Sequence, residues 1–262
     1  MNPGRLNVQA IIPAVHFKFG VLLLKLLSGL VLAIVTSGFA AEEVSTPDKI
    51  VDNYCTATQS QQQSLGASME VEIQASLPKL KKHGRLHALR RISKLGRITY
   101  ERFTFEGDGT VKNQVVARYL TAEVEAHDEQ ARELALTPAN YKFGYKTKSV
   151  LDGRTAYVFT VSPRKKRVGL FKGELWIDTA TYLPLQESGY WVKNPSIFLK
   201  KVAFVRKFEI RDGISVPLQV ASIVDTRVWG PAELEIDFTN FSPDAVAADE
   251  GPSSVAGDDD SQ

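Results

Sequence analysis

The chain has 262 residues, and its 32 Lys and Arg nearly balance its 30 Asp and Glu, giving a formal net charge of +2 at pH 7. So small a surplus excludes the strongly basic composition that is typical of nucleic-acid-binding proteins. Hydrophobic residues make up 44% of the chain, which is enough for a substantial core, and the single cysteine, Cys55, excludes an internal disulfide. Stability must therefore come from the core.

The first 40 residues have the pattern of an export signal. Residues 21–40 are mostly apolar, basic residues precede and interrupt them at Arg5, Lys18 and Lys25, and no acidic residue occurs before Glu42. A basic lead, an apolar middle and a small-residue end are typical of a secretory signal peptide. We therefore expect a signal peptide at residues 1–40, and export to the periplasm of a Gram-negative-type envelope.

An uncleaved N-terminal membrane anchor is the alternative. The charge-free apolar part, residues 26–35, is shorter than the ~20 residues that a membrane-spanning helix needs. The basic lead is also long for a signal, which leaves open whether Met1 is the true start. Cys55 lies too far beyond the apolar run to be a lipid-attachment cysteine.

Residues 41–47 read as a linker, and an amphipathic helix follows. Thr46 and Pro47 form a helix start signal, because proline is favoured at the first helical position. The next apolar residues fall on one helical face: Ile50, Val51, Tyr54 and Cys55. The pattern predicts a helix from Asp48 to Leu65, with Cys55 as a small apolar residue of its buried face.

After residue 66 the apolar period becomes two, which indicates strands. Eleven candidate strands follow at hairpin spacing, separated by Gly-Asp-Gly, Asp-Gly and Gly-Pro turns. Their ranges are 69–77, 85–92, 97–105, 112–120, 141–150, 156–161, 173–177, 183–192, 200–210, 216–224 and 234–238.

These strands predict a mainly β (α+β) fold. We expect a curved antiparallel sheet that forms an incomplete barrel, with the N-terminal helix and a second short helix at residues 123–136 as a lid. Some central strands are apolar on both faces, and either an apolar cavity or local packing under a helix or loop would explain this pattern. The domain should span residues 48–243, and the acidic segment 244–262 should be a disordered tail.

No catalytic or metal site emerges from the sequence. The GxSxG, HExxH, CxxC and P-loop patterns are absent, and His83 and His87 lie among lysines and arginines that disfavour a metal cation. We expect a non-enzymatic protein without a cofactor.

The segment from Lys79 to Arg97 is strongly basic. Its simplest interpretation is a solvated edge hairpin, in which lysine and arginine discourage edge-to-edge pairing. The functional interpretation is a patch that faces an anionic membrane surface or an acidic protein. The residues of this predicted basic patch are Lys81, Lys82, Arg85, Arg90 and Arg91.

The order of elements resembles a known superfamily. The chain has an export signal, then an amphipathic helix, then a long meander of strands. The meander contains the segment Trp176-Ile177-Asp178-x-x-Thr181-x-x-Pro184. This arrangement is similar to the periplasmic lipoprotein-carrier and sorting proteins typified by LolA, with LolB and RseB as relatives. The basic 79–97 segment and the acidic tail depart from that pattern.

The resemblance implies a carrier for a lipid or for the acyl chain of a lipoprotein. In this interpretation the helix 48–65 moves as a lid, and nucleic acid is not a partner. The expected cavity or core residues are Tyr157, Phe159, Leu175, Trp176 and Ile177. The alternative is an envelope sensor or assembly protein that binds a protein partner through the same sheet. The cargo and the oligomeric state are left open.

Overall fold

A computed structural model describes residues 46–64, 66–93, 97–128, 131–194 and 199–243. The predicted signal peptide, most of the linker and the tail lie outside these residues. The ten strands are β1 (Ala67–Leu77), β2 (Lys82–Ile92), β3 (Ile98–Gly107), β4 (Tyr141–Leu151), β5 (Arg154–Pro163), β6 (Phe171–Asp178), β7 (Pro184–Trp191), β8 (Leu199–Arg211), β9 (Ile214–Thr226) and β10 (Pro231–Pro243). The helical elements are α1 (Pro47–Ser64), η1 (Pro78–Leu80), α2 (Gly109–Val111), the π-helix η2 (Lys112–Val116), α3 (Ala117–Asp128) and α4 (Ala131–Leu134).

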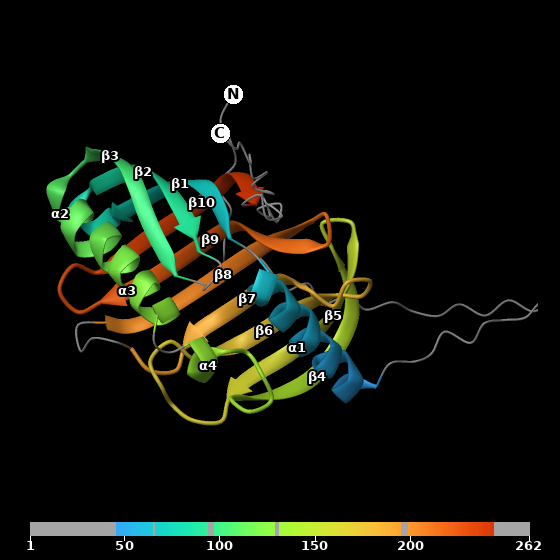
Figure 1. Cartoon of the computed structure of the whole chain (residues 1–262). Coiled ribbons are helices and arrows are strands. Elements are labelled where there is room, and N and C mark those ends of the chain that lie inside the picture. The colour runs from blue at the N-terminus through green and yellow to red at the C-terminus, as the bar shows by residue number, and fades with distance from the viewer. Residues whose placement is uncertain (1–45, 65, 94–96, 129–130, 195–198, 244–262) are drawn as a thin grey trace, which may run out of the picture. The chain divides into compact units, whose positions relative to one another are not determined.

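All ten strands form one antiparallel sheet in the order β3-β2-β1-β10-β9-β8-β7-β6-β5-β4. It consists of two meanders, β1–β3 and β4–β10, which meet where the first strand pairs with the last. In that pairing Ile73 lies opposite Ile236. The sheet curves without closing, and β3 and β4 are its edges in the described chain (Figure 1). The predicted mainly β fold with an incomplete barrel is confirmed.

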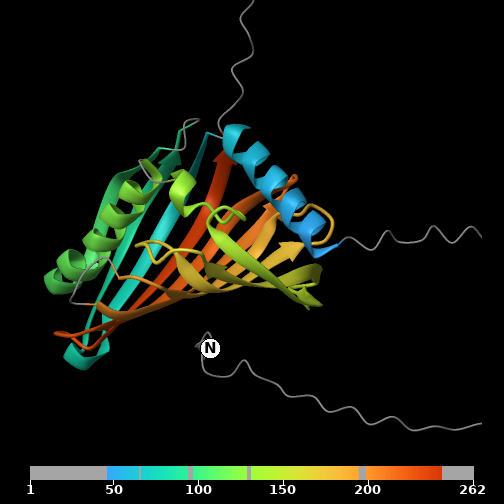
Figure 2. The same cartoon turned by 90° about the horizontal axis from the view of Figure 1, so that it is seen from below.

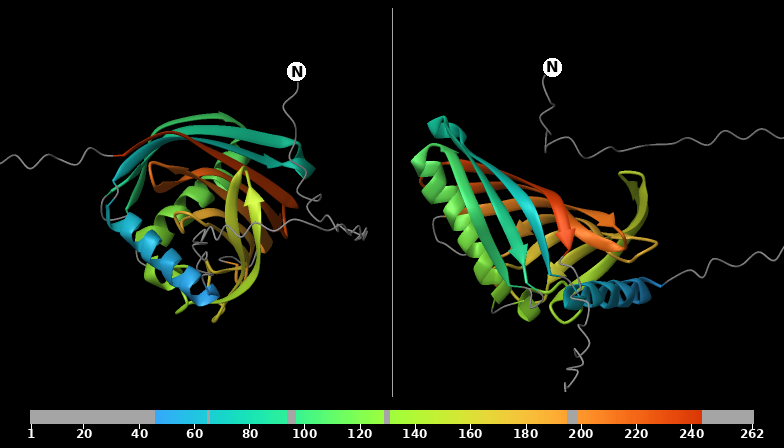
Figure 3. Two further views of the ribbon diagram at one scale, coloured as in Figure 1. Left: turned by 90° about the vertical axis from the view of Figure 1, so that its right-hand side faces the viewer. Right: turned by 45° about the horizontal axis from the view of Figure 1, so that its top comes forward.

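The helices lie on the inner, concave face of the sheet. Helix α3 runs over β1–β3 and α1 runs over the half that contains β4–β7 (Figure 2). Viewed from the side, the strands wrap around both helices (Figure 3). In the described part of the chain, no helix is both long enough and apolar enough to span a bilayer.

Two apolar clusters fill the inner face. The first lies beneath α2, η2 and α3 and consists of inward side chains from β1, β2, β9 and β10, including Met69, Ile73, Leu86, Val220 and Ile236. The second lies beneath α1 and joins its apolar face to β4–β6 through residues that include Ile50, Tyr54, Tyr141, Phe159 and Leu175. The strict alternation of β1 explains the first cluster, since every inward residue of that strand from Ala67 to Leu77 is buried.

Ten of the eleven predicted strands are confirmed, and one is wrong. Residues 112–120 form η2 and the start of α3, because their apolar side chains follow a helical rather than an alternating spacing. Val111 and Val116 are buried, and Val115, Tyr119 and Leu120 pack beside them. The predicted helix at 123–136 is confirmed in part, since α3 starts earlier and α4 is a separate turn.

Candidate functional site on the inner face of the sheet

Helix α1 covers the second apolar cluster and is tied to the sheet at its far end. Ile50, Val51 and Tyr54 are buried against β4–β6, which accounts for most of its attachment. The side chain of Gln61 donates to the carbonyl of Ser215 at 2.7 Å and accepts from its amide at 2.9 Å. These two bonds fix the last described turns of α1 against the start of β9.

Four of the five predicted cavity or core residues lie on this face. Phe159 is paired with Leu175, and Tyr157 with Ile177, so the four side chains point the same way. Three of them are fully buried beneath α1, and Tyr157 packs at the margin of the cluster, where it stacks on Tyr182. They form packed core, which a ligand could reach only if α1 moved.

Trp176 lies on the opposite face from these four. It pairs with Val158, and both alternate with the inward residues of their strands. Its indole Nε1 is buried without a hydrogen-bond partner among the described residues. Trp176 therefore belongs to the outer surface of the sheet and does not contact the cluster beneath α1.

A recess of about 310 Å³ opens beside the start of α1. That volume is at the lower end of small-molecule pockets. Its apolar wall includes Val51, Tyr141 and Phe143, which all belong to or pack on the cluster beneath the helix. Charged residues line its rim: Asp48, Asp52, Lys142 and Arg164. The recess thus leads from solvent to the edge of the buried cluster.

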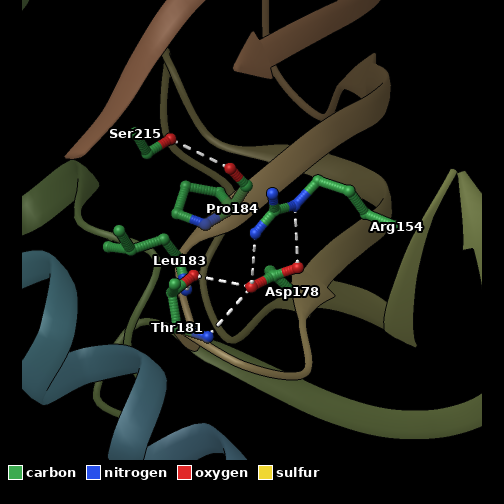
Figure 4. Close-up of polar contacts among 6 residues, drawn as sticks. All are labelled: Arg154, Asp178, Thr181, Leu183, Pro184 and Ser215. Atoms are coloured by element: carbon green, nitrogen blue, oxygen red, sulfur yellow. Dashed lines mark hydrogen bonds and ion pairs between the residues drawn. The ribbon is translucent and has the colours of Figure 1, made fainter. Parts of the chain in front are cut away.

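The segment that carries the family resemblance forms the corner between β6 and β7 (Figure 4). The carboxylate of Asp178 accepts two bonds from the guanidinium of Arg154, at 3.0 and 3.1 Å. It also accepts from the amide and hydroxyl of Thr181, at 2.9 and 2.8 Å. Burial alone would raise the pKa of Asp178, but these bonds outweigh it and hold the pKa below its usual range.

The corner is also connected to α1. Ser215 donates its hydroxyl to the carbonyl of Pro184 at 2.9 Å, as Figure 4 shows. Because the backbone of Ser215 holds Gln61, a continuous polar chain runs from the corner through β9 to the helix. Asp178 and Thr181 therefore hold the shape of the corner, and Ser215 and Gln61 connect that corner to α1.

An ion pair lies on the inner face between strands β7 and β8. Arg206 Nη1 lies 2.9 Å from Glu187 Oε2, and the Arg206 side chain is 45% exposed to solvent. Burial lowers the pKa of Arg206, but the interaction with Glu187 raises it, and the pKa ends above its ordinary value. The pKa of Tyr54 in α1 is also raised, mainly by burial and secondly by the charge of Glu187. The pattern from sequence did not predict this pair, although Glu187 is the one charged residue of its strand.

Arg90 also faces inward and, unlike the other predicted patch residues, is almost fully buried. It is 6% exposed and its guanidinium lies 3.0 Å from the Glu123 carboxylate of α3. Tyr100 donates to the same carboxylate. Burial and the Glu123 charge raise the pKa of Tyr100, so the phenol keeps its proton. This cluster fastens α3 to β2 and β3.

The other four residues of the predicted basic patch lie at or near the solvent-exposed surface. Lys81 occupies the turn after η1. The other three have acidic neighbours: Lys82 with Asp108 at 3.3 Å, Arg85 with Glu72 at 3.2 Å and Arg91 with Glu101 at 3.2 Å. Neighbouring carboxylates partly neutralise the positive charge along β2, so the end of β2 next to η1 carries the larger net positive charge.

Within the described residues, no group of three or more His, Cys, Asp or Glu side chains could hold a metal ion.

No model of a protein family matches this sequence, and no curated protein sequence matches it. Solved structures do match. A DUF1329 family protein from Desulfovibrio piger is 15% identical, with 77% of this chain and 95% of that chain covered and a TM-score of 0.43. A LolA superfamily protein from Nitrosomonas europaea is 14% identical over 75% and 92%, with a TM-score of 0.36.

A putative outer membrane lipoprotein-sorting protein domain from Vibrio parahaemolyticus is 12% identical, with 77% of this chain and 95% of that chain covered and a TM-score of 0.41. The Pseudomonas aeruginosa MucA/MucB complex also matches, at 13% identity over 74% and 99% and a TM-score of 0.27.

Proposed function

We propose that this chain is a non-enzymatic, LolA-like binding protein that holds the acyl chain of a lipid or lipoprotein on the inner face of its sheet. The observation that carries the proposal is the apolar cluster beneath α1. It includes Phe159, Leu175 and Ile177, and a recess beside the helix leads to its edge. An acyl chain gains about 0.8 kcal/mol for each CH₂ that it buries, so the burial of several CH₂ groups would offset the cost of displacing α1.

The attachment of α1 supports a role as a lid. Among the described residues, the apolar face of Ile50, Val51, Tyr54 and Cys55 and the Gln61 amide hold the helix, whereas the strands are held to one another by ladder hydrogen bonds. A ligand that enters at the recess would contact Val51 in its apolar wall and would replace the contacts of α1 with its own. The exposed part of Arg206 offers a cation to an acidic group on the ligand.

The proposal includes export. In this view residues 1–40 are a cleaved signal peptide, the domain spans 48–243 and the protein works in the periplasm. The second candidate function is an envelope sensor or assembly protein that binds a protein partner. The edge strand β4 favours this candidate, since its exposed Tyr145 and Val150 would flank a peptide added as a further strand.

The single cysteine supplies a test. Cys55 lies on α1, packs against the cluster, and has a pKa that burial and the nearby Asp52 carboxylate raise, so its thiol should react slowly. We expect a saturating fatty acid to displace α1 and to accelerate thiol labelling by about three- to tenfold. The protein purified from the envelope should also carry lipid, detectable by native mass spectrometry.

A Cys55→Ser variant provides the background for labelling. Unchanged labelling at saturating fatty acid, together with lipid-free protein from cells, would contradict the carrier function. Capture of one envelope protein that is lost on Tyr145→Glu would instead support the second candidate.

A further inference from the structure

Two turns lie side by side at one end of the sheet. One is η1 with Lys81, between β1 and β2, and the other is residues 227–230, between β9 and β10 (Figure 2). They are in contact, because the aliphatic stem of Lys79 lies directly over Gly230, where a Cβ would lie 2.3 Å from its Cδ. We call residues 78–81 and 227–230 the paired tip.

The paired tip exposes three large apolar side chains. Leu80 is 39% exposed, Val228 59% and Trp229 39%. None of them belongs to either apolar cluster of the fold, although Leu77 and Leu234, a few residues away, are buried. Since isolated turns in soluble proteins are usually polar, an apolar group here has no evident role in folding.

Hydrogen bonds hold the backbone of both turns in place. The amide and hydroxyl of Thr226 both donate to the carbonyl of Gly230, at 3.1 and 2.7 Å. The same hydroxyl accepts from the amide of Trp229 at 2.9 Å. In the other turn Lys81 donates its amide to Pro78 at 3.1 Å. The tip is therefore preorganised, and binding through it would cost little conformational entropy.

Cations surround the apolar group. Lys79, Lys81 and Arg227 are all exposed within the paired tip, and Asp225 is the acidic residue nearest to it in the chain. Tryptophan favours the interface between lipid and water, and lysine and arginine near a bilayer are attracted to anionic headgroups. Three exposed apolar side chains in the same two turns as three exposed cations match such a surface in both respects.

We propose that the paired tip inserts into the surface of an anionic lipid bilayer and orients the protein on it. The inference rests on the proposed envelope location and makes the membrane-surface role specific, but it does not depend on acyl binding. The predicted basic patch contributes through Lys81, which lies in the paired tip, whereas Lys82 pairs with Asp108 and Arg90 lies on the inner face beneath α3.

Vesicle binding of the full chain tests the proposal. Vesicles of phosphatidylcholine with 30% phosphatidylglycerol are compared with pure phosphatidylcholine, using flotation and the blue shift of tryptophan emission. We expect V228S/W229S to lower the partition coefficient by about tenfold or more, since two apolar side chains no longer leave water. Matched controls are Phe103→Ser on β3 and Val150→Ser on β4, which are 56% and 64% exposed far from the tip in sequence, and they should bind as the parent does.

A charge variant distinguishes insertion of the apolar side chains into the bilayer from electrostatic attraction of the lysines to anionic headgroups. Lys79→Glu/Lys81→Glu should remove the preference for anionic vesicles and its dependence on salt. Every variant has the same N-terminus, so any contribution of residues 21–40 is common to all. The tip variants should keep the parent's fatty-acid binding and melting temperature, which distinguishes this proposal from the carrier function.

Three outcomes would overturn the proposal. The parent chain fails to bind anionic vesicles, or V228S/W229S binds them as well as the parent, or the controls lose as much binding as the tip variants. If the tip instead contacts a protein, the parent chain will fail to bind anionic vesicles.

Discussion

Replacing Asp178 with Asn tests whether the β6–β7 corner is held by charge. Asparagine has nearly the same shape, so the substitution leaves no cavity. With its amide oxygen at the Oδ2 position, asparagine can still accept from Thr181 and from Arg154 Nη2, but its NH₂ group then meets the Nε–H of Arg154. The bond at 3.0 Å is lost, and the bond at 3.1 Å no longer joins opposite charges.

The expected cost is about 2–3 kcal/mol in the free energy of unfolding. Hydrogen bonds to a charged group contribute about 1.5–3 kcal/mol, and breaking a fully buried ion pair costs about 3–5 kcal/mol. This pair lies between those cases, because the Asp178 side chain is 3% exposed while that of Arg154 is 42% exposed and remains hydrated. For a domain of this size the melting temperature should fall by roughly 4–12 °C.

Urea denaturation as a function of pH is the assay. The lowered pKa of Asp178 means that the folded state binds the proton less readily than the unfolded state, whose pKa is about 3.9. The difference between parent and D178N should therefore be complete above about pH 5 and should shrink as the pH falls below about 4, through the folded-state pKa.

The ion pair of Lys146 and Glu174 provides the control on the same strand. Its atoms lie 2.5 Å apart, but the side chains are 53% and 31% exposed, so Glu174→Gln should change the stability by only about 0–1 kcal/mol. A D178N effect as small as that of the control, or one that does not vary with pH, would refute the reasoning.

Two further substitutions test the packing. Gln61→Ala removes both bonds between α1 and β9 and should cost about 1–2 kcal/mol and raise the labelling rate of Cys55 without ligand, whereas the exposed Gln59→Ala should have little effect on either. Gly173→Ala places a Cβ 1.8 Å from a backbone oxygen of β7 and should lower the melting temperature by about 10 °C or more, or prevent folding; Gly109→Ala, with no atom within 4 Å, should not. Wild-type labelling in the first case, or wild-type melting in the second, would show that these contacts do not hold the elements together.

Most of the sheet could be predicted because its inner face is continuous. A strand with one buried face must alternate, so β1 and β10 are evident in the sequence. The failure at residues 112–120 has the opposite cause. Val115 and Val116 are β-branched and favour strands, but Val111, Val115 and Tyr119 recur every four residues, which is the helical period that the packing selects.

The candidate site was less predictable, because alternation separates the two faces without telling which one is inside. Phe159 and Leu175 could be placed on one face and Trp176 on the other, but only the position of α1 decides which is buried. The position of Arg90 was available in the sequence, since it continues the inward series of Leu86 and Ala88 on β2. A cation in phase with core residues indicates an internal partner, which here is Glu123.

The pairing of the first strand with the last has a consequence for the timing of folding. The cluster beneath α3 needs inward residues of both β1 and β10, including Val71 and Phe238, which lie opposite each other. Until the chain has been made as far as β10, the apolar face of β1 lacks its neighbour on one side. Contacts between segments so distant in sequence form late and slowly. The cluster beneath α3 would thus be completed only after β10 has been made and has paired with β1.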